Sequence, residues 1–293
     1  MPFMDKHPPH ILTSLFRGGR LALHLFYAAL LAIFYPHLKP AKRRRILKTW
    51  SRQLLDILNI GIRTEGQWTV RAEGGYLVVA NHVSWMDIFV LNAIYPSRFI
   101  AKAEVRNWPF IGWLCKRGNT IFIERAMRRD AASINQHVSF LLKQGVCVGL
   151  FPEGTTTDGR QVGHFHSALI QPAIDAGAML CPVALRYQDK EGEQSNAAVF
   201  AGDMTLSSSI WRILRSPRFD ALLALTPILA TTGENRRALA RAAQQAIAQE
   251  LLHIAAMRQD QEPAARHAPP QAMLSLQSGY ALLLDPMLNN RPE

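Results

Sequence analysis

The chain has 293 residues, enough for one large domain or two modest ones with a substantial core. Its composition, 48% hydrophobic with a mean hydropathy of −0.01, is that of a globular protein at the apolar end of the range. The formal net charge of +11 predicts an anionic partner. The three cysteines at 115, 147 and 181 form no Cys-x-x-Cys pair, which predicts reduced core thiols in a cytosolic compartment and no metal site.

The first 65 residues hold most of the excess charge and an apolar segment. Residues 21–35 are almost wholly apolar, but as a helix they are only roughly 22 Å long, short of the ~30 Å hydrocarbon core of a membrane. A full crossing would need residues 11–16 as well, and we expect Arg17, Gly18, Gly19 and Arg20 to interrupt the helix. No clear small-x-small cleavage site follows the segment, which disfavours a signal peptide.

A basic amphipathic helix is expected after Pro40. Its apolar residues recur at helical spacing between basic ones: Ile46, Leu47, Trp50, Leu54, Leu55 and Leu58 among Arg43, Arg44, Lys48 and Arg52. This pattern predicts an anionic membrane surface as a partner, with a monotopic or single short N-terminal anchor on the cytoplasmic face of the inner membrane. The alternative is that both helices pack on the following domain as an ordinary hairpin. Nucleic acid is not expected as a partner, because no binding motif is recognisable.

Short apolar runs alternate with helical stretches from residue 67 to about residue 187. This pattern predicts an α/β fold with a largely parallel central sheet flanked by helices, in which ligands bind at the carboxyl ends of strands. The expected strands are 68–72, 76–81, 98–102, 120–123, 146–151 and 180–186, and the expected helices are 85–94, 109–117, 128–143 and 167–176.

The C-terminal third is less regular. Residues 211–214 and 221–225 are apolar but cannot be typed, 236–257 predict an Ala-rich helix, and the tail is expected to be poorly ordered. The predicted division is therefore a membrane-associated helical motif (1–64), an α/β domain (65–258) and a C-terminal tail (259–293).

A histidine and an aspartate follow the first strong apolar run, 76–80. His82 and Asp87 differ by about 140° around a helix axis, so they cannot share one helical face. They can meet if His82 lies in a turn and Asp87 in the first turn of the next helix, for which Ser84 is a good N-cap. A histidine with an orienting carboxylate can take a proton from a hydroxyl. Taken singly, a turn histidine and a capping aspartate are the simpler explanations.

A second motif, FPEGTTTDG at 151–159, follows the apolar run 146–150. Gly and Thr in a tight turn can hold a phosphate, although a strand ending in a turn would explain the segment by itself. Because His82 and Glu153 both follow apolar strands directly, we expect them to share one rim of the sheet. Together the motifs indicate transfer of a group onto an alcohol in a phosphorylated molecule.

Four blocks in this order resemble the glycerolipid acyltransferases of the lysophosphatidic acid acyltransferase type. NHVSWMD (81–87) is similar to the His-x4-Asp motif of the family, and FPEGTTTDG to its third block. Between them lie KAEV (102–105), PFIG (109–112) and GNTIFIER (118–125), and CPVA (181–184) forms the fourth block. The resemblance covers roughly residues 65–190. Glu124 stands where many relatives carry Asp, which leaves Arg125 in place.

The resemblance implies that His82 acts as general base and that Asp87 orients its imidazole, without a covalent intermediate. It implies that Arg125, Glu153 and the turn of Gly154, Thr155 and Thr156 bind the substrate. Lys102 and nearby backbone N–H groups are candidates to stabilise the oxyanion. No cofactor or metal is expected, since acyl-CoA or acyl carrier protein is a co-substrate.

The implied reaction carries a fatty acyl group to the sn-2 hydroxyl of 1-acylglycerol 3-phosphate and yields phosphatidic acid. Three alternatives remain open: acylation of another lysolipid such as lyso-ornithine lipid, a non-catalytic membrane-binding protein, and a thioesterase that uses water. No Gly-x-Ser-x-Gly elbow is present, which disfavours a covalent hydrolase. We expect structural or channel-lining roles for His164 and His166, and core or acyl-pocket positions for Trp85, Trp108 and Trp113.

Overall fold

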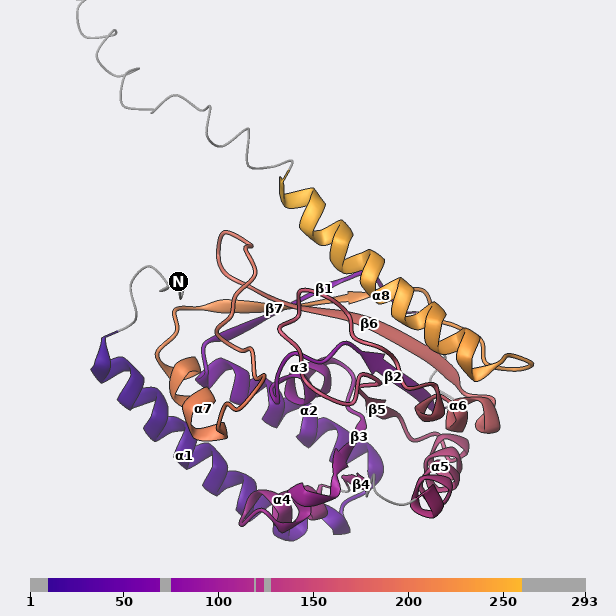
Figure 1. Ribbon diagram of the computed structural model, residues 1–293. Helices are drawn as coiled ribbons and strands as arrows, with labels where there is room; N and C mark the ends of the chain where they lie inside the picture. Colours follow the sequence, from indigo (N-terminus) through magenta and orange to yellow (C-terminus); the bar gives the residue numbers. More distant parts are fainter. Residues whose placement is uncertain (1–9, 69–74, 119, 124–127, 260–293) are drawn as a thin grey trace, which may run out of the picture. The chain divides into compact units, whose positions relative to one another are not determined.

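A central β-sheet organises the chain in the computed structural model, which describes residues 10–68, 75–118, 120–123 and 128–259 (Figure 1). The sheet has seven strands in the order β1-β7-β6-β2-β5-β3-β4. Every neighbouring pair is parallel except β6 and β7. The predicted α/β fold with a largely parallel sheet is confirmed. The strands are β1 (Ile60–Glu65), β2 (Tyr76–Ala80), β3 (Arg98–Lys102), β4 (Ile121–Ile123), β5 (Val148–Leu150), β6 (Met179–Gln188) and β7 (Phe219–Leu225).

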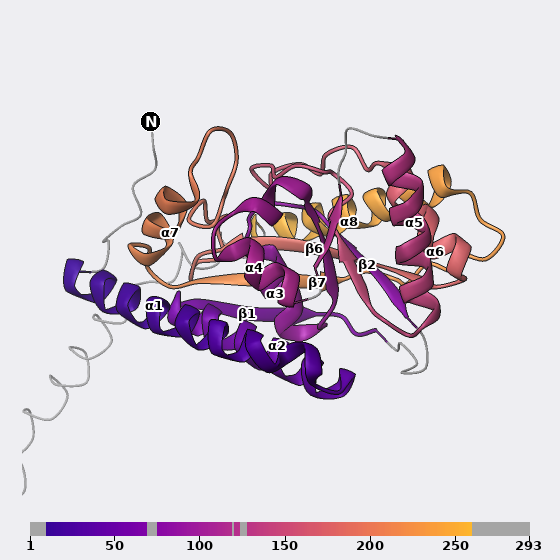
Figure 2. The ribbon, with the colours of Figure 1, turned by 90° about the horizontal axis from the view of Figure 1, so that it is seen from below.

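Helices cover both faces of this sheet. Figures 1 and 2 show α2 and α3 on one side and the part of α8 that precedes His253 on the other. Described residues up to Leu252 belong to one compact unit, and the end of α8 belongs to a second that begins at His253. The helices are α1 (Ile11–Phe34), α2 (Pro40–Ile57), α3 (Asp87–Ile94), α4 (Ile111–Arg117), α5 (Arg128–Lys143), α6 (Gln171–Ala176), α7 (Leu206–Leu214) and α8 (Arg236–Gln259), with 3-10 turns η1 (Tyr35–His37), η2 (Ala103–Asn107) and η3 (Ser167–Leu169).

Most predicted elements are confirmed with shifts of a few residues at their ends. The predicted strands at 76–81, 98–102, 120–123, 146–151 and 180–186 correspond to β2 to β6. Of the predicted strand 68–72, Trp68 is not in a strand and the other residues lie outside the described part of the chain. The apolar pieces that could not be typed are α7 and β7. The predicted tail falls outside the described residues from 260 onward.

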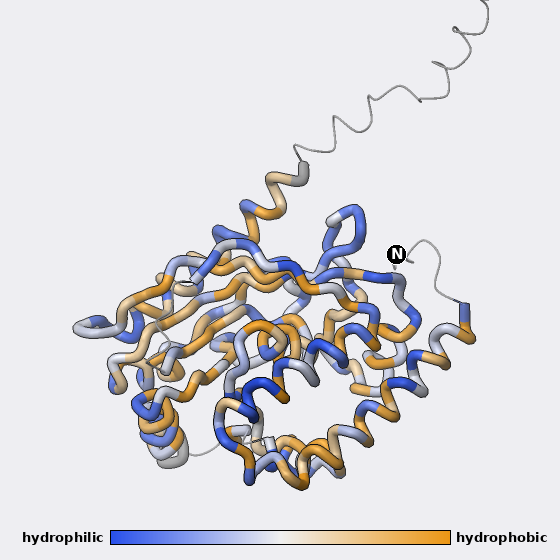
Figure 3. Tube along the Cα trace, turned by 180° about the vertical axis from the view of Figure 1, so that it is seen from behind, coloured by the Kyte–Doolittle hydropathy of each residue, from blue (hydrophilic) through white to orange (hydrophobic). Residues whose placement is uncertain are grey.

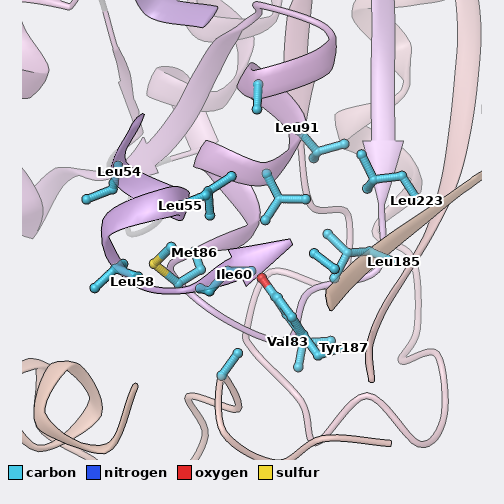
Figure 4. Packing of buried hydrophobic residues seen from close by; sticks show 14 of the residues in the cluster. Leu54, Leu55, Leu58, Ile60, Val83, Met86, Leu91, Leu185, Tyr187 and Leu223 are labelled. Carbon is cyan, nitrogen blue, oxygen red and sulfur yellow. The ribbon is translucent and has the colours of Figure 1, made fainter. Parts of the chain in front are cut away.

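Side chains that alternate along the strands build a core between the sheet and helices α2 and α3. Val78 of β2 belongs to this core. Leu185 of β6 lies in it with Leu55 of α2 and Met86 just before α3 (Figure 4). These residues are at most 1% exposed. Full burial of a side chain of this size contributes about 1.5–3 kcal/mol, so this packing fixes the position of α3 against the end of β2.

Helix α1 is continuous from Ile11 to Phe34, so the predicted interruption at Arg17–Arg20 is wrong. The Arg17 side chain donates hydrogen bonds to the carbonyl oxygens of Leu214 and Ser216 at the C-terminal end of α7, at 3.3 and 3.1 Å. This end of a helix favours a cation. A glycine inside a helix costs only about 0.5–1 kcal/mol relative to alanine, and the packing of α1 offsets that cost. By length and composition α1 with η1 is long enough to cross a membrane.

One face of α1 is buried in the protein and the other is exposed and apolar. Helix α1 packs on α2, α4 and α7, and His24 stacks on Trp50 of α2 with ring centroids 4.7 Å apart. Helix α2 packs in turn on α3 and β1, so both N-terminal helices pack on the α/β domain. Figure 3 shows hydrophobic residues along most of α1. Its exposed large apolar side chains are Ile11, Leu12, Leu15, Phe16, Leu23, Phe26, Tyr27, Leu30, Ile33 and Phe34.

Candidate active site

His82 and Asp87 meet where β2 ends and α3 begins. His82 lies in the turn after β2, and Asp87 is the first residue of α3, as the spacing predicts. The Nδ1 atom of His82 is 2.8 Å from Oδ2 of Asp87. Because an ionised carboxylate only accepts, Nδ1 carries the hydrogen and Nε2 presents its lone pair. No hydrogen bond joins Nε2 to another described residue, and the side chain is 18% exposed.

The carboxylate of Asp87 also closes the turn. It is fully buried, and Oδ2 accepts the backbone N–H groups of Val83 and Ser84 at 2.7 and 2.9 Å. The capping role and the orienting role, which the sequence leaves as alternatives, therefore belong to the same carboxylate. The predicted N-cap Ser84 is displaced: Met86 holds that position, and the Ser84 hydroxyl accepts the Met86 N–H at 3.2 Å.

The second motif lies against the first. Strands β2 and β5 are neighbours, so the loop after β5 reaches the loop after β2. The Phe151 ring stacks on the His82 imidazole with centroids 3.9 Å apart and planes 5° apart. The Thr157 N–H donates to the His82 carbonyl oxygen at 2.8 Å. Two segments about seventy residues apart in sequence thus share one rim of the sheet, as expected from their positions after strands.

Glu153 supports the backbone of His82. Its side chain is buried, Oε1 accepts the His82 N–H at 2.8 Å, and Oε2 accepts the Gly163 N–H at 2.9 Å. The Gly163 carbonyl oxygen in turn accepts from the Gln244 side chain of α8 at 2.9 Å. Burial raises the pKa of Glu153, and the two N–H groups oppose that rise in part. Both carboxylate oxygens therefore bond to the protein itself, and a role in binding substrate stays a prediction.

The remaining substrate-binding candidates are placed unequally. Gly154 has φ of +74°, the left-handed region that glycine adopts without strain, and it turns the chain next to His82. Thr155 is exposed and Thr156 is half-buried, close to the Thr157 N–H that bonds to His82. Lys102 ends β3, and only its backbone is described. Arg125 lies outside the described residues.

The other predicted positions are borne out unequally. Trp108 and Trp113 are 43% and 37% exposed, so they are not core residues, and an acyl-pocket position for them stays a prediction. Trp85 is half-buried and its indole N–H donates to the Ser209 hydroxyl at 3.1 Å. His164 and His166 are both exposed. Among the described residues no group of three or more His, Cys, Asp and Glu side chains is arranged to hold a metal ion.

Sequence reasoning missed two residues that bond to this site. The Tyr187 hydroxyl of β6 donates to Oδ1 of Asp87 at 2.7 Å. The Asn81 side chain donates to the Leu185 carbonyl oxygen and accepts the Leu185 N–H, at 2.9 and 2.8 Å. The available signals were weak: a tyrosine three residues after the CPVA block, and an asparagine next to His82.

Comparison with known proteins identifies the family. Residues 61–186 match the family model described as Acyltransferase. A 1-acyl-sn-glycerol-3-phosphate acyltransferase of Neisseria meningitidis is 39% identical over 211 residues, 72% of this chain and 82% of that protein. A lyso-ornithine lipid O-acyltransferase of Pseudomonas aeruginosa is 38% identical over 222 residues, 76% of this chain and 84% of that protein.

A solved structure has the same fold. The crystal structure of the 1-acyl-sn-glycerophosphate acyltransferase of Thermotoga maritima superposes with a TM-score of 0.61 and 22% identity, over 83% of this chain and 98% of that one. The molecule is an acyltransferase. Within that class, the chain belongs to the family of the 1-acyl-sn-glycerol-3-phosphate acyltransferases. Lyso-ornithine lipid O-acyltransferases are also among the relatives of this chain.

Proposed function

We propose that the enzyme transfers a fatty acyl group from acyl-CoA or acyl carrier protein to the sn-2 hydroxyl of 1-acylglycerol 3-phosphate, which gives phosphatidic acid. The observation that carries the proposal is the 2.8 Å pair of His82 Nδ1 and Asp87 Oδ2, with Nε2 open and the FPEGTTT loop beside it. In this reading His82 is the general base and Asp87 orients it.

The reaction follows from the tautomer of His82. Nε2 accepts the proton of the acceptor hydroxyl as its oxygen attacks the thioester carbonyl, and Asp87 stabilises the imidazolium that forms. The tetrahedral oxyanion then collapses, the C–S bond breaks, and Nε2 returns the proton to the leaving thiolate. Lys102 and backbone N–H groups are proposed to stabilise the oxyanion. The scheme uses the acyl donor as a co-substrate and requires no cofactor.

Gly154, Thr155, Thr156 and Arg125 are proposed to bind the phosphate of the acceptor. The positive φ of Gly154 supports a tight turn whose backbone N–H groups and threonine hydroxyls can face an anion. Arginine supplies paired donors that suit a phosphate. Glu153 is proposed to support this turn, because its carboxylate bonds to the backbone of His82 and of Gly163 and holds the turn against the loop that follows β2.

A second acceptor has a specific observation in its favour. The lyso-ornithine lipid O-acyltransferase of Pseudomonas aeruginosa and the Neisseria meningitidis enzyme match this chain at nearly equal identity and coverage. Acylation of a lyso-ornithine lipid would keep the same roles for His82 and Asp87 and remove the phosphate from the turn. The sequence similarity alone favours neither acceptor.

An assay of the purified enzyme with both acceptors tests the choice. With one acyl donor, kcat/KM is measured for 1-acylglycerol 3-phosphate and for lyso-ornithine lipid, in His82→Ala and in the wild type. We expect a preference for the phosphate and a loss of about 10²–10⁴-fold in His82→Ala. His137→Ala, an exposed histidine of α5, is the matched control. A higher kcat/KM for the ornithine lipid rejects 1-acylglycerol 3-phosphate as the acceptor. Release of the fatty acid in the absence of any acceptor supports a thioesterase. Full activity of His82→Ala rejects the proposed general-base mechanism.

We also propose that the enzyme is monotopic on the cytoplasmic face of the membrane. A helix that buries one face against α2, α4 and α7 cannot also cross the bilayer while those elements stay in water. The exposed apolar face of α1 suits burial at the level of the acyl chains, with the basic residues of α2 toward anionic headgroups.

A further inference from the structure

The buried carboxylate of Asp87 uses both oxygens. Oδ2 accepts from His82 Nδ1 and from two backbone N–H groups, whereas Oδ1 accepts from the hydroxyl of Tyr187 at 2.7 Å. Asp87 is 0% exposed. A buried carboxylate oxygen without a donor costs free energy, so the Tyr187 hydroxyl stabilises the charged form of this side chain.

Tyr187 is directed at Asp87 by the alternation of β6. Val183, Leu185 and Tyr187 are spaced by two and all point into the core shared with α2 and α3. Figure 4 shows the Tyr187 ring beside Val83, which follows His82. The ring is fully buried, and Phe219 of β7 packs edge-on against it at 5.9 Å. The packing around the ring therefore directs the Tyr187 hydroxyl toward Oδ1 of Asp87.

Asn81 fixes the register that brings the two residues together. The β2–β6 ladder ends at the pair Ala80 and Val183. The Asn81 side chain then replaces a backbone peptide, since it both donates to and accepts from Leu185. β6 is thus held to the residue that precedes His82, and Tyr187 lies two positions further along the same strand.

We propose that Tyr187 is a positioning residue of the acyl transfer: through Oδ1 it holds the Asp87 carboxylate in the orientation that keeps Oδ2 on His82 Nδ1, and it limits how strongly that carboxylate retains the imidazolium proton. During the reaction the proton moves from the acceptor hydroxyl to Nε2 and then to the thiolate. Tyr187 neither gains nor loses a proton. Burial and the adjacent Asp87 raise the pKa of Tyr187 well above its ordinary value, so the hydroxyl stays a donor.

The inference rests on the proposed role of His82 as general base. Removing only the hydroxyl, in Tyr187→Phe, leaves Oδ1 of Asp87 buried without that donor and makes the carboxylate more basic. We expect kcat to fall roughly tenfold while KM for donor and acceptor stays within about twofold, because a hydrogen bond to a charged group is lost but no substrate contact is. Tyr76→Phe, which removes a half-buried phenol at the start of β2, is the matched control and should retain wild-type kcat.

The pH dependence of kcat/KM distinguishes a positioning role of Tyr187 from a role in core packing alone. Among the described residues, the ionisable groups that hydrogen-bond to the His82 ring or backbone are Asp87 of α3 and Glu153 after β5, and Tyr187 of β6 bonds to Asp87. In Tyr187→Phe the acid limb of log kcat/KM should move to higher pH, because a more basic carboxylate holds the imidazole proton more strongly. Replacement of Tyr187 by 3-fluorotyrosine keeps the ring and strengthens the donor, so the limb should move to lower pH.

The outcomes distinguish the inference from the function it rests on. If His82→Ala is inactive but neither Tyr187 variant changes kcat or the acid limb, Tyr187 does not position the pair and the inference is overturned. If His82→Ala keeps full activity, the proposed base itself is wrong. If Tyr187→Phe fails to fold, the fluorotyrosine enzyme decides alone, and an unshifted acid limb overturns the inference.

Discussion

The Phe151 ring lies flat on the imidazole of His82, with centroids 3.9 Å apart and an angle of 5° between the planes. Phe99 of β3 extends the stack, since its ring centroid is 5.6 Å from that of Phe151. The stack leaves His82 little freedom to rotate away from Asp87. It also means that the FPEG motif contributes an aromatic surface beside the His82 imidazole as well as a turn.

Replacement of Phe151 by leucine should therefore slow the reaction. Loss of a stacked ring removes about 0.5–1.5 kcal/mol, and if this is expressed in the orientation of His82 the fall in kcat is roughly two- to tenfold. Steady-state kinetics of Phe151→Leu measure it. Phe140→Leu, at an exposed phenylalanine of α5, is the control. Unchanged kcat in Phe151→Leu would show that the stack does not orient the base.

Asp87→Asn should damage catalysis and stability together. The NH2 group of the amide is a donor, so it would face one of the donors that now bond to the Asp87 carboxylate, among them His82 Nδ1. The wrong histidine tautomer is then favoured, and a loss of about 10²–10⁴-fold in kcat is expected. The thermal midpoint should fall as well, because a buried donor is left unpaired. Asp175→Asn, at an exposed aspartate of α6, should change neither measurement.

The stability of the enzyme should depend on pH through Glu153. Its pKa is raised above the ordinary value of 4.5 in the folded protein, chiefly by burial, so the folded state keeps this proton at pH values where the unfolded chain has lost it. The wild type should then lose stability relative to Glu153→Gln as the pH rises from 4.5 through the raised pKa, and the difference should be constant above that window.

Thermal unfolding of both proteins in detergent, at constant ionic strength between pH 4 and pH 8, measures this difference. A gap between the two midpoints that stays constant across the range, or that changes in the opposite sense, would contradict the prediction. Activity measured in parallel tells whether protonation of Glu153 also disturbs the backbone of His82, which it supports at 2.8 Å.

Binding to vesicles should depend on the exposed face of α1. Phe26 is 64% exposed there, and Phe26→Asp both removes apolar area and adds a negative charge. Since burial of a phenylalanine contributes about 1.5–3 kcal/mol, binding to vesicles that contain anionic lipid should weaken at least about tenfold. Phe140→Asp changes a phenylalanine that is 58% exposed on α5 and should bind normally. Equal loss in both variants would reject α1 as the membrane-facing element.

Much of the site could be predicted from the sequence because its parts are local. His82 and Asp87 are five residues apart, and the FPEG motif directly follows a strand, so the carboxyl-end rule for parallel sheets brings them together. Tyr187 could not be found this way. Its bond to Asp87 depends on the register of β6 against β2, which the Asn81 side chain fixes. The hydrophobic pattern of the sequence does not indicate that register.

The element that could not be typed and the one that was predicted wrongly have equally physical reasons. β7 is buried over nearly its whole length, so it lacks the alternation that distinguishes a half-exposed strand from a buried helix. The interruption in α1 is expected from two arginines and two glycines, but the structure gives Arg17 partners inside the protein. The carbonyl oxygens of Leu214 and Ser216 solvate it, and they belong to a segment about 200 residues away.

The pairing of β1 with β7 determines how late in synthesis the edge of the sheet can form. Among the described strands its one neighbour is β7, with Ile60 opposite Phe219 and Glu65 opposite Ala224. A ribosome that adds 5–20 residues per second needs roughly 10–30 s to make the intervening ~160 residues. The β1 segment must therefore wait without its strand partner until β7, late in the described part of the chain, has been synthesised. Helices α1 and α2 are therefore synthesised well before β7, the strand that pairs with β1.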